Sequence, residues 1–276
     1  MHSTRAIGIF DSGYGGLTIM DEILKELPGY DYIYLGDNAR APYGTRSFET
    51  VYRYTLECVH WFFEMGCPLV ILACNTASAK ALRTIQQVDL PSMGDNKKVL
   101  GVIRPTTEII GKYTKTKSVG ILATNGTVQS NSYPIEIHKF FPEVEVIQEA
   151  CPMWVPLVEN NEHQGPGADY FVKQNIEGLF KKGRKVDTVL LACTHYPMLQ
   201  EKIGNFLPSG VTLLSQGRIV AESFATYLAR HPEIETKCSK NGDRTFYTTD
   251  STLDFNNHAG IFFGQPLQSK HVDLIG

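Results

Sequence analysis

Short runs of aliphatic residues recur along the chain and alternate with segments of helical periodicity. The runs are rich in Ile, Val and Leu, and we predict strands at residues 6–10, 32–36, 69–73, 99–103, 118–123, 143–147, 188–192, 211–214 and 244–249. Their apolar residues are continuous rather than alternating, which is typical of parallel strands that helices cover on both faces. This alternation predicts an α/β fold with mainly parallel sheets.

Several of the intervening segments have clear helical signals. Residues 17–27 place apolar side chains at a period of 3.6, and residues 167–183 and 218–230 are amphipathic in the same way. Ser47 is a good N-cap for a helix that would run to Gly66, where a glycine can end it.

Parts of the sequence occur twice. "LVILACNTA" around Cys74 resembles "VLLACTHYP" around Cys193, and "IGIFDSG" resembles "VGILATNGT". We therefore predict two similar α/β lobes, the first formed by residues 1–98 plus 213–276 and the second by residues 99–212. In open α/β sheets ligands bind outside the carboxyl ends of the strands. Each lobe would then contribute one cysteine to an active site in the cleft between them.

The residues after Cys74 predict a helix start. Asn75, Thr76 and Ser78 can cap the helix that "AKALRTIQQ" continues. A thiol at a helix N-terminus lies near unpaired N–H groups, which lower its pKa. Starting from a pKa near 8.5, the thiolate would cost only about 2 kcal/mol at pH 7. The alternative is that both repeated cysteines are buried and inert.

Cys193 has a similar context. Thr194 and His195 follow it, and Pro197 suits the first turn of a helix. His195 could assist the thiol by moving protons, or it could be a core histidine with its hydrogen bonds satisfied.

Two loops follow predicted strands. "DSGYGGLT", which begins at Asp11, is glycine-rich and suits an anion held by backbone N–H groups, although it matches no nucleotide-binding motif. Asp11 could be an orienting base, an ammonium ligand or a simple turn residue. The second loop, residues 35–47, is rich in turn residues and hydrogen-bond donors.

The composition excludes several classes of protein. The chain has 276 residues, of which 42% are hydrophobic and 20% charged, with a net charge of −3, so neither nucleic acid nor a membrane is an expected partner. Its apolar runs are shorter than the roughly 20 residues that span a bilayer. No signal peptide is visible, so we expect a cytoplasmic protein with free thiols. The six cysteines form no close ligand pair, so no metal is expected.

Six sequence motifs, taken together, are similar to those of a known family. "DSGYGGLT", "LGDNARAPYG", "ACNTAS", "ATNGTVQSNSY", "ACPMWVPLVE" and "ACTHYP" occur in this order. Together they resemble the bacterial glutamate racemases, within the cofactor-independent aspartate/glutamate racemase superfamily, from about residue 7 to the C-terminus. Tyr14 departs from the small aliphatic residue usual in the glycine loop, and "VIRPTTEII" departs from the usual glycine-bearing turn, which leaves the shape of both loops open.

The resemblance implies roles for individual residues. Cys74 and Cys193 match the two catalytic cysteines, and Asp11, His195 and Glu159 match the polar residues that assist them. Asp37 matches a further acid near the site. The positions that match substrate-binding residues are Asp11, Ser12, Pro42, Tyr43, Gly44, Asn75, Thr76, Thr194 and His195.

The resemblance also implies an activity. It is the racemisation of L-glutamate and D-glutamate without a cofactor, by two cysteines on opposite faces of the substrate, which supplies D-glutamate for peptidoglycan synthesis. Glutamate is then the expected partner and a homodimer is a candidate assembly. The alternatives are an aspartate racemase, a single-base decarboxylase, a metal-binding protein using Cys74, Cys193 and His195, and a non-catalytic protein that binds acidic amino acids.

Overall fold

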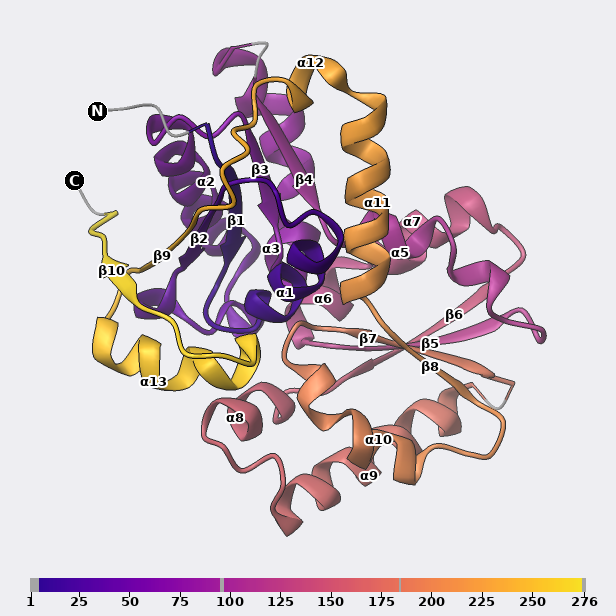
Figure 1. Cartoon of the computed structure of the whole chain (residues 1–276). Coiled ribbons are helices and arrows are strands. Elements are labelled where there is room, and N and C mark those ends of the chain that lie inside the picture. The colour runs from indigo at the N-terminus through magenta and orange to yellow at the C-terminus, as the bar shows by residue number, and fades with distance from the viewer. Residues whose placement is uncertain (1–4, 95–96, 184, 275–276) are drawn as a thin grey trace.

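The computed structural model describes residues 5–94, 97–183 and 185–274, which form two parallel sheets (Figure 1). The first sheet has the order β10-β9-β2-β1-β3-β4 and the second has the order β6-β5-β7-β8. The strands are β1 (Ile7–Asp11), β2 (Tyr32–Gly36), β3 (Leu69–Leu72), β4 (Lys98–Gly101), β5 (Ser118–Ala123), β6 (Glu145–Ala150), β7 (Thr188–Ala192), β8 (Thr212–Ser215), β9 (Arg244–Thr248) and β10 (Ser269–His271). The predicted two-lobed α/β fold is confirmed.

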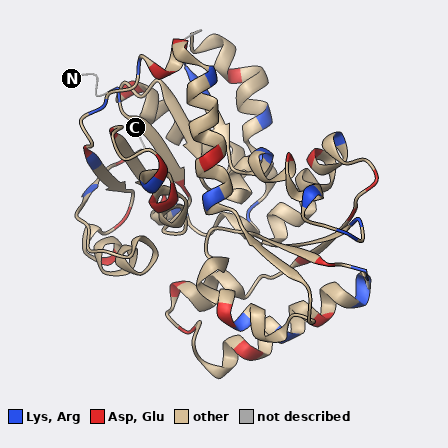
Figure 2. Ribbon diagram, turned by 45° about the vertical axis from the view of Figure 1, so that its right-hand side comes forward, with Lys and Arg blue, Asp and Glu red and all other residues tan. Residues whose placement is uncertain are grey.

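Helices surround both sheets. They are α1 (Gly16–Glu26), α2 (Phe48–Glu64), α3 (Asn75–Lys80), α4 (Leu82–Thr84), α5 (Ile103–Thr107), α6 (Asn125–Ser130), α7 (Ser132–Phe140), α8 (Trp154–Glu159), α9 (Pro166–Lys182), α10 (Gln200–Phe206), α11 (Gly217–Arg230), α12 (Pro232–Glu235) and α13 (Thr252–Phe263). Acidic and basic residues are interspersed along their outer faces (Figure 2). Within the described ranges, no helix combines the length and apolar character needed to cross a bilayer.

The strongest local signals predicted their elements well. Ser47 caps α2 by accepting a hydrogen bond from the backbone N–H of Thr50, and Gly66 follows the helix with a φ of 90°, which favours glycine. The segment after Cys74 differs from the prediction, because the expected long helix is interrupted at Ala81: α3 ends at Lys80, the short α4 follows, and a π-helical turn spans Ile85–Asp89. β10 was not predicted, since it is a short polar edge strand paired only with β9.

Strand pairing corrects the predicted boundaries between the lobes. The boundary at 98/99 falls inside β4, which pairs along its whole length with β3 in the first sheet. The boundary at 212/213 falls inside β8, which pairs with β7 in the second sheet. By sheet membership, the chain therefore leaves the first lobe after Gly101 and returns to it after Ser215. Both errors have the same cause, because strand sequences alone do not reveal which sheet a strand joins.

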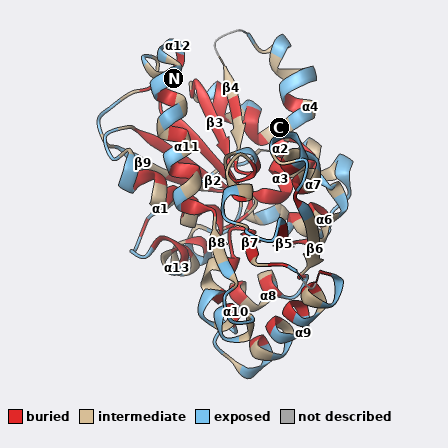
Figure 3. Cartoon of the chain, turned by 90° about the vertical axis from the view of Figure 1, so that its right-hand side faces the viewer, coloured by how far each residue is buried: buried red, intermediate tan, exposed pale blue. Residues whose placement is uncertain are grey.

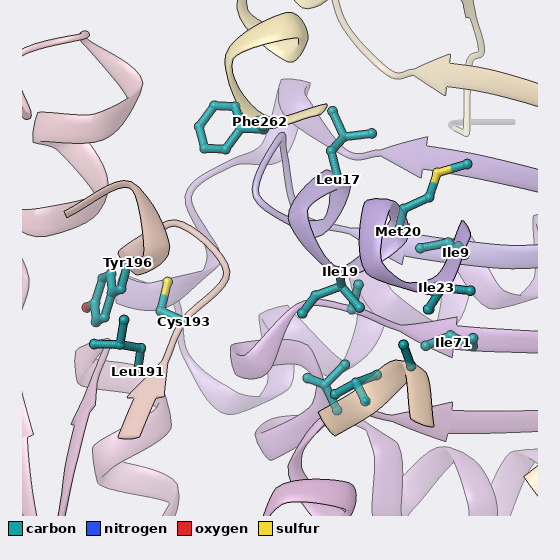
Figure 4. Close-up of a cluster of buried hydrophobic side chains, with 14 of the residues drawn as sticks. Ile9, Leu17, Ile19, Met20, Ile23, Ile71, Leu191, Cys193, Tyr196 and Phe262 are labelled. Carbon is teal, nitrogen blue, oxygen red and sulfur yellow. The ribbon is translucent and has the colours of Figure 1, made fainter. Parts of the chain in front are cut away.

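The buried residues concentrate on the strands and on the helix faces that cover them (Figure 3). One hydrophobic cluster crosses from lobe to lobe. It runs from Ile9 and Ile71 in the first sheet, through Leu17 of α1, to Leu191 and Cys193 at the end of β7 (Figure 4). The same hydrophobic cluster therefore includes residues of α1 and residues at the carboxyl end of β7.

Candidate active site

The predicted site residues lie where strands of the two sheets end. Asp11 is the last residue of β1, Cys74 follows the end of β3 by two residues, and Cys193 directly follows β7. Both cysteines are buried, with exposures of 6% and 7%. The six cysteines of the chain are all free thiols. The strand-end positions inferred from the sequence are therefore present in both lobes.

Cys74 is itself the N-cap of α3. Its sulfur accepts a hydrogen bond from the backbone N–H of Ala77 at 3.4 Å, in place of the Asn75, Thr76 or Ser78 cap that the sequence suggested. Its thiol donates to the Ser12 hydroxyl at 3.5 Å.

The pKa of Cys74 differs from the sequence-based expectation. Burial and the nearby charge of Asp11 raise the pKa of Cys74 to about 12, although the contacts with Ser12 and Ala77 act in the opposite direction. The prediction of a lowered pKa was wrong for this thiol, because desolvation outweighs the helix terminus. Cys193 also contributes to the rise, less than burial and Asp11 do. At roughly 1.36 kcal/mol per pH unit, the Cys74 thiolate costs about 7 kcal/mol at pH 7.

Asp11 is buried beside the first thiol, with an exposure of 1%. Its Oδ2 accepts a hydrogen bond from the backbone N–H of Gly13 at 2.9 Å. Its Oδ1 is also buried and has no hydrogen-bond partner among the residues that the structure describes. Burial raises the pKa of Asp11, and the charge of His195 partly offsets that rise. A buried acceptor without a partner is costly, so this atom is suited to bind a donor from a ligand.

Cys193, His195 and Glu159 form a chain of contacts in the second lobe. The His195 Nδ1 lies 4.0 Å from the Cys193 sulfur, and its Nε2 lies 3.0 Å from Oε1 of Glu159 at the end of α8. Burial acts to lower the pKa of His195, but the hydrogen bonds with Cys193 and Glu159 outweigh it and raise the pKa to about 10. The imidazole is therefore positively charged at neutral pH, directly beside the second thiol.

The glycine loop of the first lobe packs against this histidine. A Cβ added at Gly15 would lie 2.2 Å from Oγ1 of Thr194 and 2.5 Å from Nδ1 of His195. The hydroxyl of Thr18, in α1, donates to the Thr194 carbonyl at 3.1 Å. Phe262 of α13 contacts the His195 ring edge-on, with the centroids 5.2 Å apart. Glycine at position 15 thus permits a close approach of the two lobes at the site.

The second loop is held by a buried carboxylate. Asp37 is fully buried and accepts hydrogen bonds from Arg40 at 2.7 Å, from Thr249 at 2.9 Å and from the Tyr43 hydroxyl. These partners use its oxygens, so Asp37 orders the loop rather than facing a ligand. Pro42, in contrast, is exposed, and Tyr43 is buried.

At Gly44 the same loop comes close to the second lobe. A Cβ at Gly44 would lie 3.0 Å from the side chain of Thr124. Thr124, the N-cap of α6, also approaches the first lobe through its hydroxyl, which lies 3.0 Å from that of Thr76. Thr124 was not singled out from the sequence, although "ATNGT" follows a predicted strand just as "ACNT" does.

Gln216 and Tyr133 are two further residues near the site that the sequence did not predict. Both are buried and both hydrogen bond to the Asn75 side chain. No motif marks either residue, because their importance depends on how the lobes meet.

A cavity of about 400 Å³ adjoins the second thiol. Its lining includes Thr18 of α1, Cys193, Thr194 and Gln216. Among the described residues, no group of three or more His, Cys, Asp or Glu side chains is placed to hold a metal ion.

The site and fold define a class of protein with one thiol at the end of a strand in each of two parallel sheets. A family model described as Asp/Glu/Hydantoin racemase matches residues 7–223. A glutamate racemase from Geobacter metallireducens is 40% identical over 264 residues, which are 95% of this chain and 94% of that protein. The chain therefore belongs to the Asp/Glu/Hydantoin racemase family, and it is an amino-acid racemase.

Solved structures agree with this assignment. A glutamate racemase isoform from Bacillus anthracis has a TM-score of 0.88 and 34% identity, with 99% of each chain covered. A glutamate racemase from Francisella tularensis in complex with D-glutamate has a TM-score of 0.86 and 30% identity, covering 99% of this chain and 98% of that one. The resemblance inferred from the motifs is confirmed.

Proposed function

We propose that this protein interconverts L-glutamate and D-glutamate by a two-base mechanism in which Cys74 and Cys193 exchange protons with opposite faces of the α-carbon. The observation that carries the proposal is the pair of buried strand-end thiols, one per lobe, each beside a different charged group. Glutamate is favoured as the substrate because relatives over nearly the whole chain are glutamate racemases, one of them in complex with D-glutamate.

Racemisation needs two acid–base groups. The reaction removes the α-hydrogen from one face and returns a proton to the other, so a single base on one face would mostly restore the starting configuration. In one direction the Cys193 thiolate takes the α-proton and the Cys74 thiol donates its proton to the opposite face, which leaves Cys74 as the thiolate. In the reverse direction the two sulfurs exchange roles.

The charges around the thiols suit the first of these directions. The pKa of Cys74 is raised to about 12, which keeps it protonated and ready to donate. Nδ1 of His195 lies 4.0 Å from the Cys193 sulfur, and the raised pKa of His195 favours the protonated imidazole at this position. Glu159 holds His195 in place from its other nitrogen. Asp11, His195 and Glu159 are thus the proposed assisting residues.

Substrate binding would use the groups around the thiols. The unpartnered Oδ1 of Asp11 is suited to accept the α-ammonium group, whose positive charge would also lower the cost of a thiolate at Cys74. The carboxylate groups of the substrate would accept hydrogen bonds from the protein. These bonds would strengthen as negative charge develops in the transition state. The proposed substrate-binding residues are Asp11, Ser12, Pro42, Tyr43, Gly44, Asn75, Thr76, Thr194 and His195. No cofactor is required by this mechanism, because the protein itself stabilises the developing carbanion.

The test is racemisation of each pure enantiomer in deuterated water without added cofactor. Two bases predict that solvent deuterium enters the product enantiomer early, with little in the recovered substrate. Rapid exchange into unreacted substrate would refute the two-base assignment in favour of one base. The same assay with aspartate tests the alternative substrate. Carbon dioxide release would indicate a decarboxylase, and binding without turnover a non-catalytic binding protein.

The biological role is part of the same proposal. A glutamate racemase supplies D-glutamate for peptidoglycan synthesis in the cytoplasm, and we propose that role here. A homodimer remains the candidate assembly, which sedimentation would test directly.

A further inference from the structure

Gln216 closes a ring of hydrogen bonds with Asn75 and Tyr133. The Gln216 Oε1 accepts from Nδ2 of Asn75 at 2.8 Å, and its Nε2 donates to the Tyr133 hydroxyl at 2.7 Å. That hydroxyl in turn donates to Oδ1 of Asn75 at 2.6 Å. All three residues are buried, with exposures of 3%, 2% and 0% for Gln216, Asn75 and Tyr133. Hydrogen bonds in such a closed, water-free ring reinforce one another.

Gln216 also contacts both places where the chain crosses between the lobes. It follows β8, where the chain returns to the first lobe and begins α11 (Figure 1). Its Nε2 lies 3.2 Å from the carbonyl oxygen of Val102, which follows β4 where the chain leaves that lobe. Oγ1 of Thr106 is also 3.2 Å away. Since Nε2 has two hydrogens, one serves Tyr133 and the other is shared by the groups at the outgoing crossing.

The ring fixes which atoms of Asn75 remain for other partners. Its Oδ1 is taken by Tyr133 and one hydrogen of Nδ2 by Gln216. Rotating the amide by half a turn would place its oxygen against the oxygen of Gln216, which is unfavourable in a buried site. Within the described residues, the second N–H of the Asn75 amide has no hydrogen-bond acceptor. Asn75 is therefore held as a donor and not as an acceptor.

We propose that Gln216 is a positioning residue, which locks the amide of Asn75 so that its remaining N–H binds a carboxylate of the substrate. This inference rests on the proposed function, in which Asn75 contacts glutamate. Gln216 also ties this contact to the relative position of the lobes, because the same side chain joins both crossings. A ligand with an acceptor at this position is selected, and one with a donor is not.

The first experiment measures, without substrate, how firmly the Asn75 side-chain amide is held by its hydrogen bonds. Hydrogen exchange of the Asn75 side-chain amide, followed by NMR, should be about fivefold faster in Gln216→Ala and in Tyr133→Phe, since the loss of one hydrogen bond typically costs about 1 kcal/mol. Tyr133→Phe removes only one oxygen and keeps the apolar packing. Tyr32→Phe is the matched control, because its buried ring also loses one hydrogen bond, to the Leu27 carbonyl, away from the site. Unchanged exchange in the first two variants would overturn the proposal.

The second experiment asks whether Gln216 acts through Asn75. Gln216→Ala should lower kcat/KM for glutamate by about tenfold, chiefly through KM, whereas the same change in an Asn75→Ala background should cost less than about threefold. An equal loss in both backgrounds would show that Gln216 acts independently and would overturn the proposal. If Asn75→Ala turns over too slowly, the dissociation constant of D-glutamate is compared instead. A wild-type protein that neither binds nor racemises glutamate would overturn the proposed function, while the exchange experiment would still decide the role of Gln216.

Discussion

Replacing Glu159 with glutamine should lower the pKa of His195. The wild-type pKa is raised from 6.5 to about 10, and Glu159 is one of the two hydrogen-bonding partners that raise it. The difference of 3.5 pH units corresponds to about 5 kcal/mol in favour of the charged imidazole. Loss of one opposite charge near a buried group typically shifts its pKa by about 1–3 pH units. We therefore expect the pKa of His195 in Glu159→Gln to fall by that amount.

The change should also alter how stability depends on pH. The folded protein binds the His195 proton more tightly than the unfolded chain, so this contribution is complete below about pH 6.5 and is lost as the pH rises towards about 10. The stabilisation contributed by His195 therefore falls as the pH rises across this range. In Glu159→Gln the range should be narrower, because the pKa of His195 in the folded protein is lower. Urea denaturation at pH 6 and pH 9 measures the slope.

The direct assay is an NMR titration of the His195 ring. Glu162→Gln is the matched control, because Glu162 is an exposed glutamate three residues further along the chain and makes no contact with His195. If His195 titrates at the same pH in Glu159→Gln as in the wild type, the contact at 3.0 Å does not determine its charge, and the proposed role of Glu159 is refuted.

Three further results are expected. Cys74→Ser and Cys193→Ser should abolish racemisation but retain glutamate binding. Alanine at Cys58, Cys67, Cys151 or Cys238 should instead change only the stability of the fold, by about 1 kcal/mol or more. Turnover measurements and calorimetry distinguish the two groups of variants. Gly15→Ala should destabilise the fold by about 1–3 kcal/mol and reduce turnover, because its Cβ would meet Thr194 and His195, while Gly29→Ala, with nothing within 4 Å, should not. Asp11→Asn and His195→Asn should lower kcat unequally for the two enantiomers, with opposite preferences; equal losses in both directions would contradict separate helper roles.

The fold was predictable where periodicity alone determines the structure. Fully buried strands such as β5 and β7 read as continuous apolar runs, and Ser47 and Gly66 mark both ends of α2. The sheet to which β4 and β8 belong could not be read, because pairing partners are set by tertiary packing. β10 was missed for a related reason, since an edge strand of polar residues has no apolar run to detect.

The candidate site divides in the same way. Asp11, Cys74 and Cys193 follow apolar runs, so their strand-end positions could be inferred from the sequence. Their electrostatic environments could not, because the pKa of Cys74 depends on burial and on a charge from another strand. Gln216 had no sequence signal at all, since its contacts with Asn75 and Val102 join segments that are distant along the chain.

The two thiols have opposite electrostatic surroundings, and the equilibrium limits what this can achieve. A negative carboxylate near Cys74 favours its thiol, whereas Cys193 lies 4.0 Å from the His195 imidazole, whose pKa is raised. The enantiomers of glutamate have equal free energy in water, so the kcat/KM values of the two directions must be equal. An asymmetric site can therefore favour one resting protonation state and change kcat and KM separately, but their quotient must balance. It follows that the form in which Cys74 is the thiolate and Cys193 is the thiol must also be accessible. The ammonium group of the substrate, bound beside Asp11, would lower the free-energy cost of that form.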